Sequence, residues 1–175
     1  PDTITYVCAL KACGSTVELI EEGQKIHTEI TKDGLELDPC IGISLLDMYA
    51  KCGFLREAQE VFNELSSQDV VSWNVLIAGY VEHGHNEEVL NFCERMHHEG
   101  ISPDLVTLVC GLKASASLGA IEKGREMYVN IMKKSLERDI VVGNTLIDMY
   151  AKCGNLQEAH HVFEKLSVRD HVTWN

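Results

Sequence analysis

Two stretches decide the fold: residues 42–53 read Gly-Ile-Ser-Leu-Leu-Asp-Met-Tyr-Ala-Lys-Cys-Gly, and residues 143–154 read Gly-Asn-Thr-Leu-Ile-Asp-Met-Tyr-Ala-Lys-Cys-Gly. The second stretch repeats the first at an offset of 101 residues. Val-Ser-Trp-Asn at 71–74 returns as Val-Thr-Trp-Asn at 172–175, at the same offset. Self-similarity at a fixed period is the signature of repeat architectures, so the chain is predicted to be a repeat protein.

Three shorter units fill the long period. Boundaries at 3–38, 39–69, 70–104, 105–139 and 140–170 give units of 36, 31, 35, 35 and 31 residues, and 171–175 begins a sixth unit. Each complete unit ends in an aspartate, and these are Asp38, Asp69, Asp104, Asp139 and Asp170. The recurring aspartate supports this division of the chain.

Each unit is predicted to form two helices. In unit 70–104 the first helix should run from about Ser72, a suitable N-cap, to a break at Gly84, and the second should start near Asn86. A glycine recurs between the two predicted helices, where a left-handed C-cap is expected, at Gly53, Gly84, Gly119 and Gly154. Five residues after each glycine comes a residue small enough to let helices approach closely: Ala58, Val89, Gly124 or Ala159.

A single hairpin of this size cannot bury its own apolar stripe, so the hairpins must stack to share a core. The predicted fold is therefore all-α, a right-handed α-solenoid of stacked helix-turn-helix repeats. In such a stack the first helices of successive units lie side by side and present their N-terminal turns in register.

The composition limits the class of protein further. Apolar residues make up 45% of the chain, enough for a continuous core, and the net charge of −12 weakens nonspecific attraction to nucleic acid. The seven cysteines include no Cys-x-x-Cys pair, and we expect most of them to be reduced and buried as small apolar side chains. The chain has no apolar run long enough for a membrane span and no N-terminal leader. Since both ends fall inside the repeated pattern, we expect a fragment of a longer protein.

The unit lengths and motifs distinguish between helical-repeat families. The tetratricopeptide repeat holds close to about 34 residues with a Leu-Gly signature, which is missing here. The chain instead resembles the pentatricopeptide-repeat (PPR) family, in its plant subclass that alternates P, L and S units. Unit 70–104 opens with Val-Val-Ser-Trp-Asn and closes with Ile-Ser-Pro-Asp, like a P unit. Units 3–38 and 105–139 carry Leu-Lys-Ala and resemble L units, while 39–69 and 140–170 carry Asp-Met-Tyr-Ala-Lys-Cys-Gly and resemble S units; 171–175 would begin a further P unit.

This resemblance implies that the chain binds single-stranded RNA, about one base per repeat. In the family, the fifth and last residues of a unit read a base, and an aliphatic second residue sandwiches neighbouring bases. The implied reading residues are Asn74 with Asp104, Asn144 with Asp170, and Asn175, whose partner lies beyond the chain. Weaker pairs are Val7 with Asp38, Ile43 with Asp69, and Val109 with Asp139. The implied sandwiching residues are Ile4, Val71, Val106, Val141 and Val172; Cys40 departs from the aliphatic pattern.

The chemistry of an Asn beside an Asp is compatible with base reading. An asparagine amide offers one acceptor and two donor hydrogens, so it can match the Watson–Crick edge of a pyrimidine, and a nearby aspartate can orient it. The amide can rotate, so uracil and cytosine are both open on these grounds; the family resemblance implies a preference for uracil at units 70–104 and 140–170. Valine and isoleucine cannot donate or accept, so the other units should read weakly.

Several of these residues also have simpler roles. An asparagine or aspartate at a helix start can act as a cap, and this role is compatible with base reading. Trp73 and Trp174 are expected in the core, not as stacking platforms for bases. Three His-x-Glu triplets, beginning at His27, His85 and His97, match half of a deaminase zinc motif, but without Cys-x-x-Cys they are assigned to helix surfaces.

The sequence thus predicts no enzymatic activity, no metal, no cofactor, no small-molecule substrate and no membrane partner. The resemblance implies that the parent protein is an RNA-processing or C-to-U editing factor of the mitochondrion or chloroplast, whose transit peptide lies outside this fragment. Protein editing cofactors are further partners that the resemblance implies. One alternative is a protein-binding helical-repeat scaffold, which the acidic balance favours. Another is a folded array whose five units bind nothing tightly by themselves.

Overall fold

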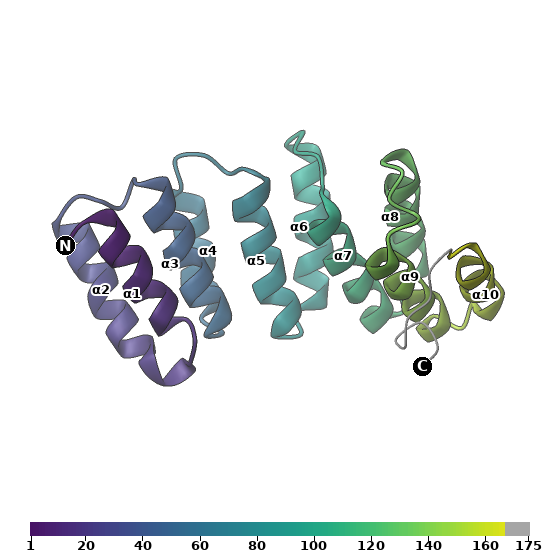
Figure 1. Ribbon diagram of the computed structural model, residues 1–175, viewed down its shortest axis with the longest axis horizontal. Coiled ribbons are helices and arrows are strands. Elements are labelled where there is room, and N and C mark those ends of the chain that lie inside the picture. Colours follow the sequence, from purple (N-terminus) through teal and green to yellow (C-terminus); the bar gives the residue numbers. More distant parts are fainter. Residues whose placement is uncertain (167–175) are drawn as a thin grey trace. The chain divides into compact units, whose positions relative to one another are not determined.

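The computed structural model describes residues 1–166, and these residues are entirely helical or in turns (Figure 1). The helices are α1 (Thr3–Cys13), α2 (Ile20–Lys32), α3 (Pro39–Lys51), α4 (Leu55–Glu64), α5 (Val70–Glu82), α6 (Asn86–His98), α7 (Leu105–Leu118), α8 (Ile121–Lys133), α9 (Ile140–Lys152) and α10 (Leu156–Lys165). Two of these helices fall in each of the five predicted units. The all-α prediction is confirmed.

The odd-numbered helices begin at an aspartate. The α5 helix starts at Val70 with Asp69 as its N-cap, so the prediction of a Ser72 cap was wrong. Ser72 is the third helical residue, where its amide donates to Asp69 Oδ1 over 2.9 Å and its hydroxyl donates to the Asp69 carbonyl over 2.9 Å. Both residue types favour caps, and the one that comes first in the chain takes the position.

A left-handed glycine lies between the two helices of four units, as predicted. The φ angles of Gly53, Gly84, Gly119 and Gly154 are 80°, 78°, 66° and 78°. Because most side chains disfavour this conformation, glycine ends the first helix and lets the chain reverse. Unit 3–38 lacks such a glycine at this point and instead has a short 3-10 turn, η1 (Val17–Leu19), before α2.

The described residues divide into two compact parts, 1–84 and 85–166, at the turn between α5 and α6. In the first part α3 packs on both α1 and α5, while α2 packs on α1 and α4 packs on α3. In the second part α7 packs on α9, and α6, α8 and α10 cover these two helices. Within each part, the first helices of successive units are therefore neighbours.

The core of the first part centres on α3. This helix lies between α1 and α5, so residues on most of its sides are buried. Trp73 of α5 is fully buried and meets the Phe62 ring of α4 edge-on at a centroid distance of 4.6 Å, which confirms its predicted place in the core. The apolar interior holds the N-terminal turns of the first helices in place.

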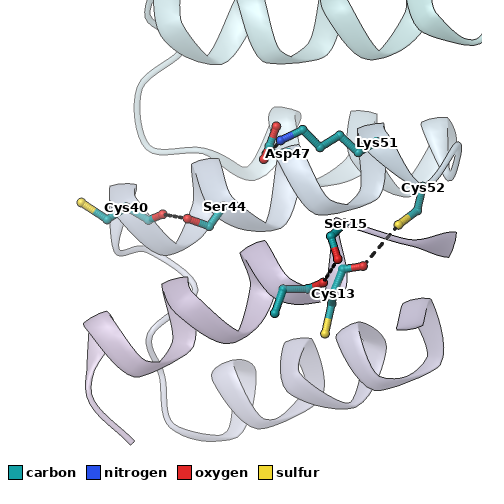
Figure 2. A network of polar contacts seen from close by, with 8 residues as sticks. Cys13, Ser15, Cys40, Ser44, Asp47, Lys51 and Cys52 are labelled. Atoms are coloured by element: carbon teal, nitrogen blue, oxygen red, sulfur yellow. Dashed lines mark hydrogen bonds and ion pairs between the residues drawn. The ribbon is translucent and has the colours of Figure 1, made fainter. Parts of the chain in front are cut away.

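Polar contacts attach α3 to the end of α1 and stabilise α3 itself (Figure 2). The Cys52 thiol donates to the Cys13 carbonyl at 3.7 Å, and within α3 the Lys51 ammonium pairs with Asp47 at 2.7 Å. The prediction that most cysteines are buried was wrong: Cys13, Cys52 and Cys110 are buried, whereas Cys8 and Cys40 are exposed and Cys93 and Cys153 are half-buried. Cys8 and Cys40 occupy helix positions that face away from the neighbouring helices.

Candidate nucleic-acid interface

The last residue of each of the first four units caps the first helix of the next unit. The Asp38 carboxylate accepts from the Cys40 amide at 2.9 Å and the Ile41 amide at 3.2 Å, and Asp69, Asp104 and Asp139 form equivalent bonds with α5, α7 and α9. All of these cap bonds use the Oδ1 atom. The capping role considered from the sequence is therefore real at these four aspartates.

A hydroxyl three residues after the aspartate reinforces several caps. The Thr5 hydroxyl donates to Asp2 Oδ1 at 2.6 Å, and the Thr107 hydroxyl donates to Asp104 Oδ1 at 3.3 Å. The bonds from the side chain and backbone of Thr5 lower the pKa of the Asp2 carboxyl. The sequence reasoning missed these hydroxyls, although the recurrence of Asp-x-x-Ser/Thr at residues 2–5, 69–72 and 104–107 was a usable signal.

The first unit shows how its two ends meet. Asp38, the last residue, accepts a 3.3 Å hydrogen bond at Oδ2 from the hydroxyl of Thr3, the first residue. Val7 follows Thr3 by four residues, so the two side chains lie on the same face of α1. The Asp38 carboxylate is thus placed at the end of α1 that carries the fifth residue, and the Thr3 contact was not foreseen from the sequence.

Aliphatic side chains at the second position of the units are exposed. Ile4 is 73% exposed, Val71 49%, Val106 46% and Val141 52%. Cys40 occupies the same position in unit 39–69 and is also exposed. Burying such side chains is favourable, so their repeated exposure at one turn of α1, α5, α7 and α9 marks a surface suited to an apolar or planar ligand.

The fifth residues lie at the border between core and surface. Val7, Ile43, Asn74 and Asn144 are half-buried, whereas Val109 is buried. Neither asparagine residue is buried in the core. Each lies at the boundary between core and surface, at the first-helix position that the family resemblance assigns to base reading.

A glycine directly before the fifth residue shapes the turn in the two predicted S units. A Cβ atom at Gly42 would lie 2.5 Å from Leu65 Cδ2, and a Cβ at Gly143 would collide with Leu166 in the same way. Each leucine follows the second helix of its own unit and packs on the back of the first helix. This contact fixes the turn that carries Ile43 or Asn144.

For three of the predicted pairs, both residues of the pair lie within the same compact part of the chain. Val7 with Asp38 and Ile43 with Asp69 belong to residues 1–84, and Val109 with Asp139 belongs to 85–166. Asn74 and Asp104 belong to different parts, so their pairing stays a prediction. Asp170, Val172, Trp174 and Asn175 lie outside the described residues, and the predictions on them stay predictions as well.

No group of three or more His, Cys, Asp or Glu side chains among residues 1–166 could hold a metal ion. His27, from the first His-x-Glu triplet, is half-buried and its Nδ1 lies 3.0 Å from the Tyr49 hydroxyl. No helix in the described range is both long and apolar enough to cross a membrane.

Family comparisons match this architecture. The PPR repeat family model matches residues 68–116, and a second PPR repeat model matches residues 43–70 and 144–171. Together these matches cover more than half of the chain. The chain belongs to the pentatricopeptide-repeat family. This is a repeat family, so this stretch is a PPR array.

The PPR relatives are longer than this chain. A chloroplastic pentatricopeptide repeat-containing protein of Arabidopsis thaliana is 36% identical over 175 residues, which is 100% of this chain and 21% of that protein. A putative mitochondrial pentatricopeptide repeat-containing protein of the same plant is 38% identical over 177 residues, which is 100% of this chain and 28% of that protein. The chain thus spans less than a third of the length of these relatives.

Solved PPR structures share the fold. The protein PPR10, in complex with an 18-nt psaJ RNA element, superposes with a TM-score of 0.73 at 24% identity, covering 93% of this chain and 24% of PPR10. The PPR domain of Arabidopsis thaliana protein-only RNase P 1, in complex with tRNA, gives a TM-score of 0.69 at 13% identity, covering 94% of this chain and 91% of that one. The α-solenoid class predicted from the sequence is confirmed.

Proposed function

We propose that this PPR array binds single-stranded RNA along the N-terminal turns of its first helices, with about one base per repeat. The observation that carries the proposal is the exposed aliphatic side chain at the second residue of α1, α5, α7 and α9, next to an aspartate cap. Apolar side chains at a regular step offer stacking surfaces to successive bases. The two RNA-bound PPR structures of the same fold support RNA as the ligand.

In this proposal the fifth residue of a unit contacts the base, and the aspartate orients the side chain of that residue. Oδ1 of each described cap holds the backbone of the following helix, which fixes the carboxylate. A fixed carboxylate can orient an asparagine amide through its other oxygen, directly or through a water molecule. The cap therefore pre-organises the reading position.

The proposed base preference follows from the fifth residues. Asn74 with Asp104 and Asn144 with Asp170 should select a pyrimidine, preferably uracil, at two positions separated by one base. Val7, Ile43 and Val109 have no polar atoms in their side chains, so their units should discriminate weakly. We also infer that the units follow the P, L, S alternation, because their lengths and motifs do so.

The whole protein is proposed to act on organellar transcripts as a processing factor or C-to-U editing factor. Relatives matched over nearly the full chain are named as chloroplastic or mitochondrial proteins, which supports a plant organelle as the compartment. Protein cofactors of editing are proposed as further partners. The remainder of such a protein would supply other repeats and any processing domain.

A protein-binding scaffold is the second candidate function, and the net charge of −12 is the observation that favours it. Acidic surfaces repel the phosphate backbone, and stacked hairpins also form peptide-binding grooves. The two functions predict different responses to RNA sequence. A scaffold should bind all short RNAs equally weakly.

The proposal is tested with the chain as it stands and a panel of short labelled RNAs, at low and moderate salt. Asn74→Ala should weaken binding to the RNA with uracil at the matched position by on the order of 1 to 3 kcal/mol, and it should remove the preference for uracil there. Asn91→Ala is the matched control, because Asn91 is exposed on α6, away from the first helices. Equal affinity of Asn74→Ala and wild type for the matched RNA would refute the assignment.

A further inference from the structure

A cleft of about 390 Å³ opens in the second part of the chain, at the C-terminal ends of α6 and α8. Its walls are formed by the end of α6, the loop that leads into α7, and the end of α8. The lining residues are His97, Gly100, Ile101, Ser102, Pro103, Asn130, Lys133 and Lys134. All of the cleft belongs to residues 85–166.

The charge of this cleft differs from that of the chain around it. Two lysines and a histidine line it, and none of the lining residues is acidic. Residues 85–175 hold 10 Lys and Arg with 13 Asp and Glu, whereas residues 1–84 hold 5 with 14. The cleft is thus a local cationic site in an acidic protein.

The two lysines of the cleft remain available to an anion. Among residues 1–166, neither Lys133 nor Lys134 forms an ion pair, and Lys134 donates one hydrogen bond to the Ser102 hydroxyl at 2.6 Å. An ammonium carries three donors, so two of those on Lys134 remain. Lys123 offers a contrast: it lines the adjoining apolar hollow and is paired with Glu94 at 2.6 Å and Glu126 at 3.2 Å.

The cleft lies beside the N-terminal turn of α7, which carries the exposed Val106. Ser102, which bonds to Lys134, precedes the Asp104 cap by two residues and the exposed Val106 by four. Four residues of extended chain span at most about 14 Å, so the lysines and Val106 lie within the reach of one or two nucleotides. A strand with a base on Val106 would pass this cleft with its backbone.

The helix dipole alone does not explain why two lysines follow each other at the end of α8. Cations at a helix C-terminus interact favourably with the helix dipole, so a purely stabilising role is the simpler explanation. The equivalent helix end in unit 3–38 has Lys32 and Asp33, however, and Asp33 accepts a 2.7 Å bond from the Tyr6 hydroxyl. The same architecture therefore forms with an acid at the position of Lys134.

We propose that this cleft holds a phosphodiester group of the RNA strand whose base stacks on Val106. This inference rests on the proposed RNA-binding function and adds a backbone contact on the second helices. Lys133 and Lys134 supply the charge, and Ser102 and Asn130 supply neutral hydrogen-bonding groups. Such a site offsets, at one repeat, the repulsion that the acidic array exerts on phosphates.

The test measures the affinity of the chain for the matched RNA over a range of salt concentrations, with the double variant K133Q/K134Q. The variant should bind every RNA of the panel more weakly by the same factor. The slope of log K against log salt should shrink by roughly 0.7 for each phosphate that the protein no longer neutralises. The preference for uracil over adenine at the Asn74 and Asn144 positions should be unchanged. K32Q is the matched control, and it should leave the slope as in wild type.

The outcomes separate this inference from the proposed function. Absence of RNA binding by the wild-type chain removes the proposed function, and the cleft proposal with it. Sequence-selective binding with an unchanged salt slope in K133Q/K134Q overturns the cleft proposal alone. In a further arm, inorganic phosphate replaces chloride at constant ionic strength, and it should weaken RNA binding by the wild type more than by K133Q/K134Q, because phosphate and the strand compete for the cleft. Phosphate that binds the cleft without weakening RNA binding would identify a free-phosphate site and overturn the assignment to the strand.

Discussion

The aspartate that closes each described unit contributes to both stability and the proposed base recognition. Its Oδ1 atom satisfies backbone amides of the following helix, which otherwise lack partners within the helix. Asparagine offers a similar acceptor at the same place, whereas alanine offers none. Substitutions can therefore separate the capping role from the reading role.

Asp104 is the residue at which to separate these two roles. Asp104→Ala should reduce the free energy of unfolding by about 1 kcal/mol, because α7 loses its cap, and it should also weaken RNA binding. Asp104→Asn should keep the stability close to wild type and change the preference for the base opposite unit 70–104. Urea denaturation and RNA titration of both variants measure these effects. Identical base preference in Asp104→Asn and wild type would show that the carboxylate only caps.

The left-handed backbone conformation of Ser135 leads to a second prediction. It has a φ of 56° at the end of α8, where the equivalent residue after α2 is Gly34 with a φ of 68°. Ser135→Gly should therefore stabilise the chain by about 0.5 to 1 kcal/mol, since glycine adopts this conformation without steric cost. Gly34→Ser, which meets no atom within 4 Å, should destabilise it by a similar amount. Thermal unfolding of both variants provides the measurement, and shifts of the same sign would contradict the account.

Individual residues differ in how well the sequence predicts them. The interhelical glycines and the buried Trp73 could be predicted, because glycine and tryptophan at those positions have few alternatives. The start of α5 was misplaced from Asp69 to Ser72, since both residues favour caps. The left-handed Ser135 and the Thr3 bond to Asp38 could not be predicted, because neither residue type signals its conformation or a partner 35 residues away.

At the scale of elements, close contact between the first helices of successive units holds each compact part of the chain together. A Cβ atom on Gly79 of α5 would lie 2.6 Å from Ala50 Cβ and 3.2 Å from Ala50 Cα of α3. A backbone atom cannot move aside without shifting the helix. A Cβ on Gly111 of α7 would instead meet the flexible end of Met127. The sequence predicted close helix packing but not which glycines are in contact with a neighbouring backbone.

Gly79→Ala and Gly111→Ala form a matched pair. Alanine favours a helix over glycine by about 1 kcal/mol in both places, but overpacking against Ala50 should cost about 1 to 3 kcal/mol. Gly79→Ala should thus destabilise residues 1–84, while Gly111→Ala should stay within about 1 kcal/mol of wild type. Denaturant unfolding compares the two. A more stable Gly79→Ala variant would disprove the close approach of α3 and α5.

The hydrogen bond from Tyr6 to Asp33 links α1 to the end of α2, and it should make the stability of the fold depend on pH. The hydrogen bond to Asp33 raises the pKa of Tyr6 to about 12, and burial raises the pKa of Tyr49 to about 12. An unfolded chain releases these protons near pH 10, so their stabilising effect is complete below that pH and is lost as the pH rises towards 12. Tyr6→Phe should make the loss of thermal stability between pH 10 and 12 shallower, and the remaining slope should come from the other groups with a raised pKa, among them Tyr49 and Tyr150. The same slope in both proteins would remove Tyr6 from this account.

At the scale of the molecule, the array is acidic and short, and it spans less than a third of the length of its PPR relatives. In the proposed function, the base contacts of these repeats would therefore supply selectivity against an unfavourable electrostatic background. The repeat period, which was visible in the sequence, predicts the spacing of these contacts. The positions of the two asparagines along that period predict which bases matter.

The most direct test of the account is the affinity of the chain for RNAs that carry uracil at two positions separated by one base. We expect this RNA to bind most tightly, and each replacement of a uracil by adenine should cost on the order of 1 to 3 kcal/mol. Moving the second uracil by one base should cost as much as replacing it. Equal affinity for all of these RNAs would contradict base reading by the repeats.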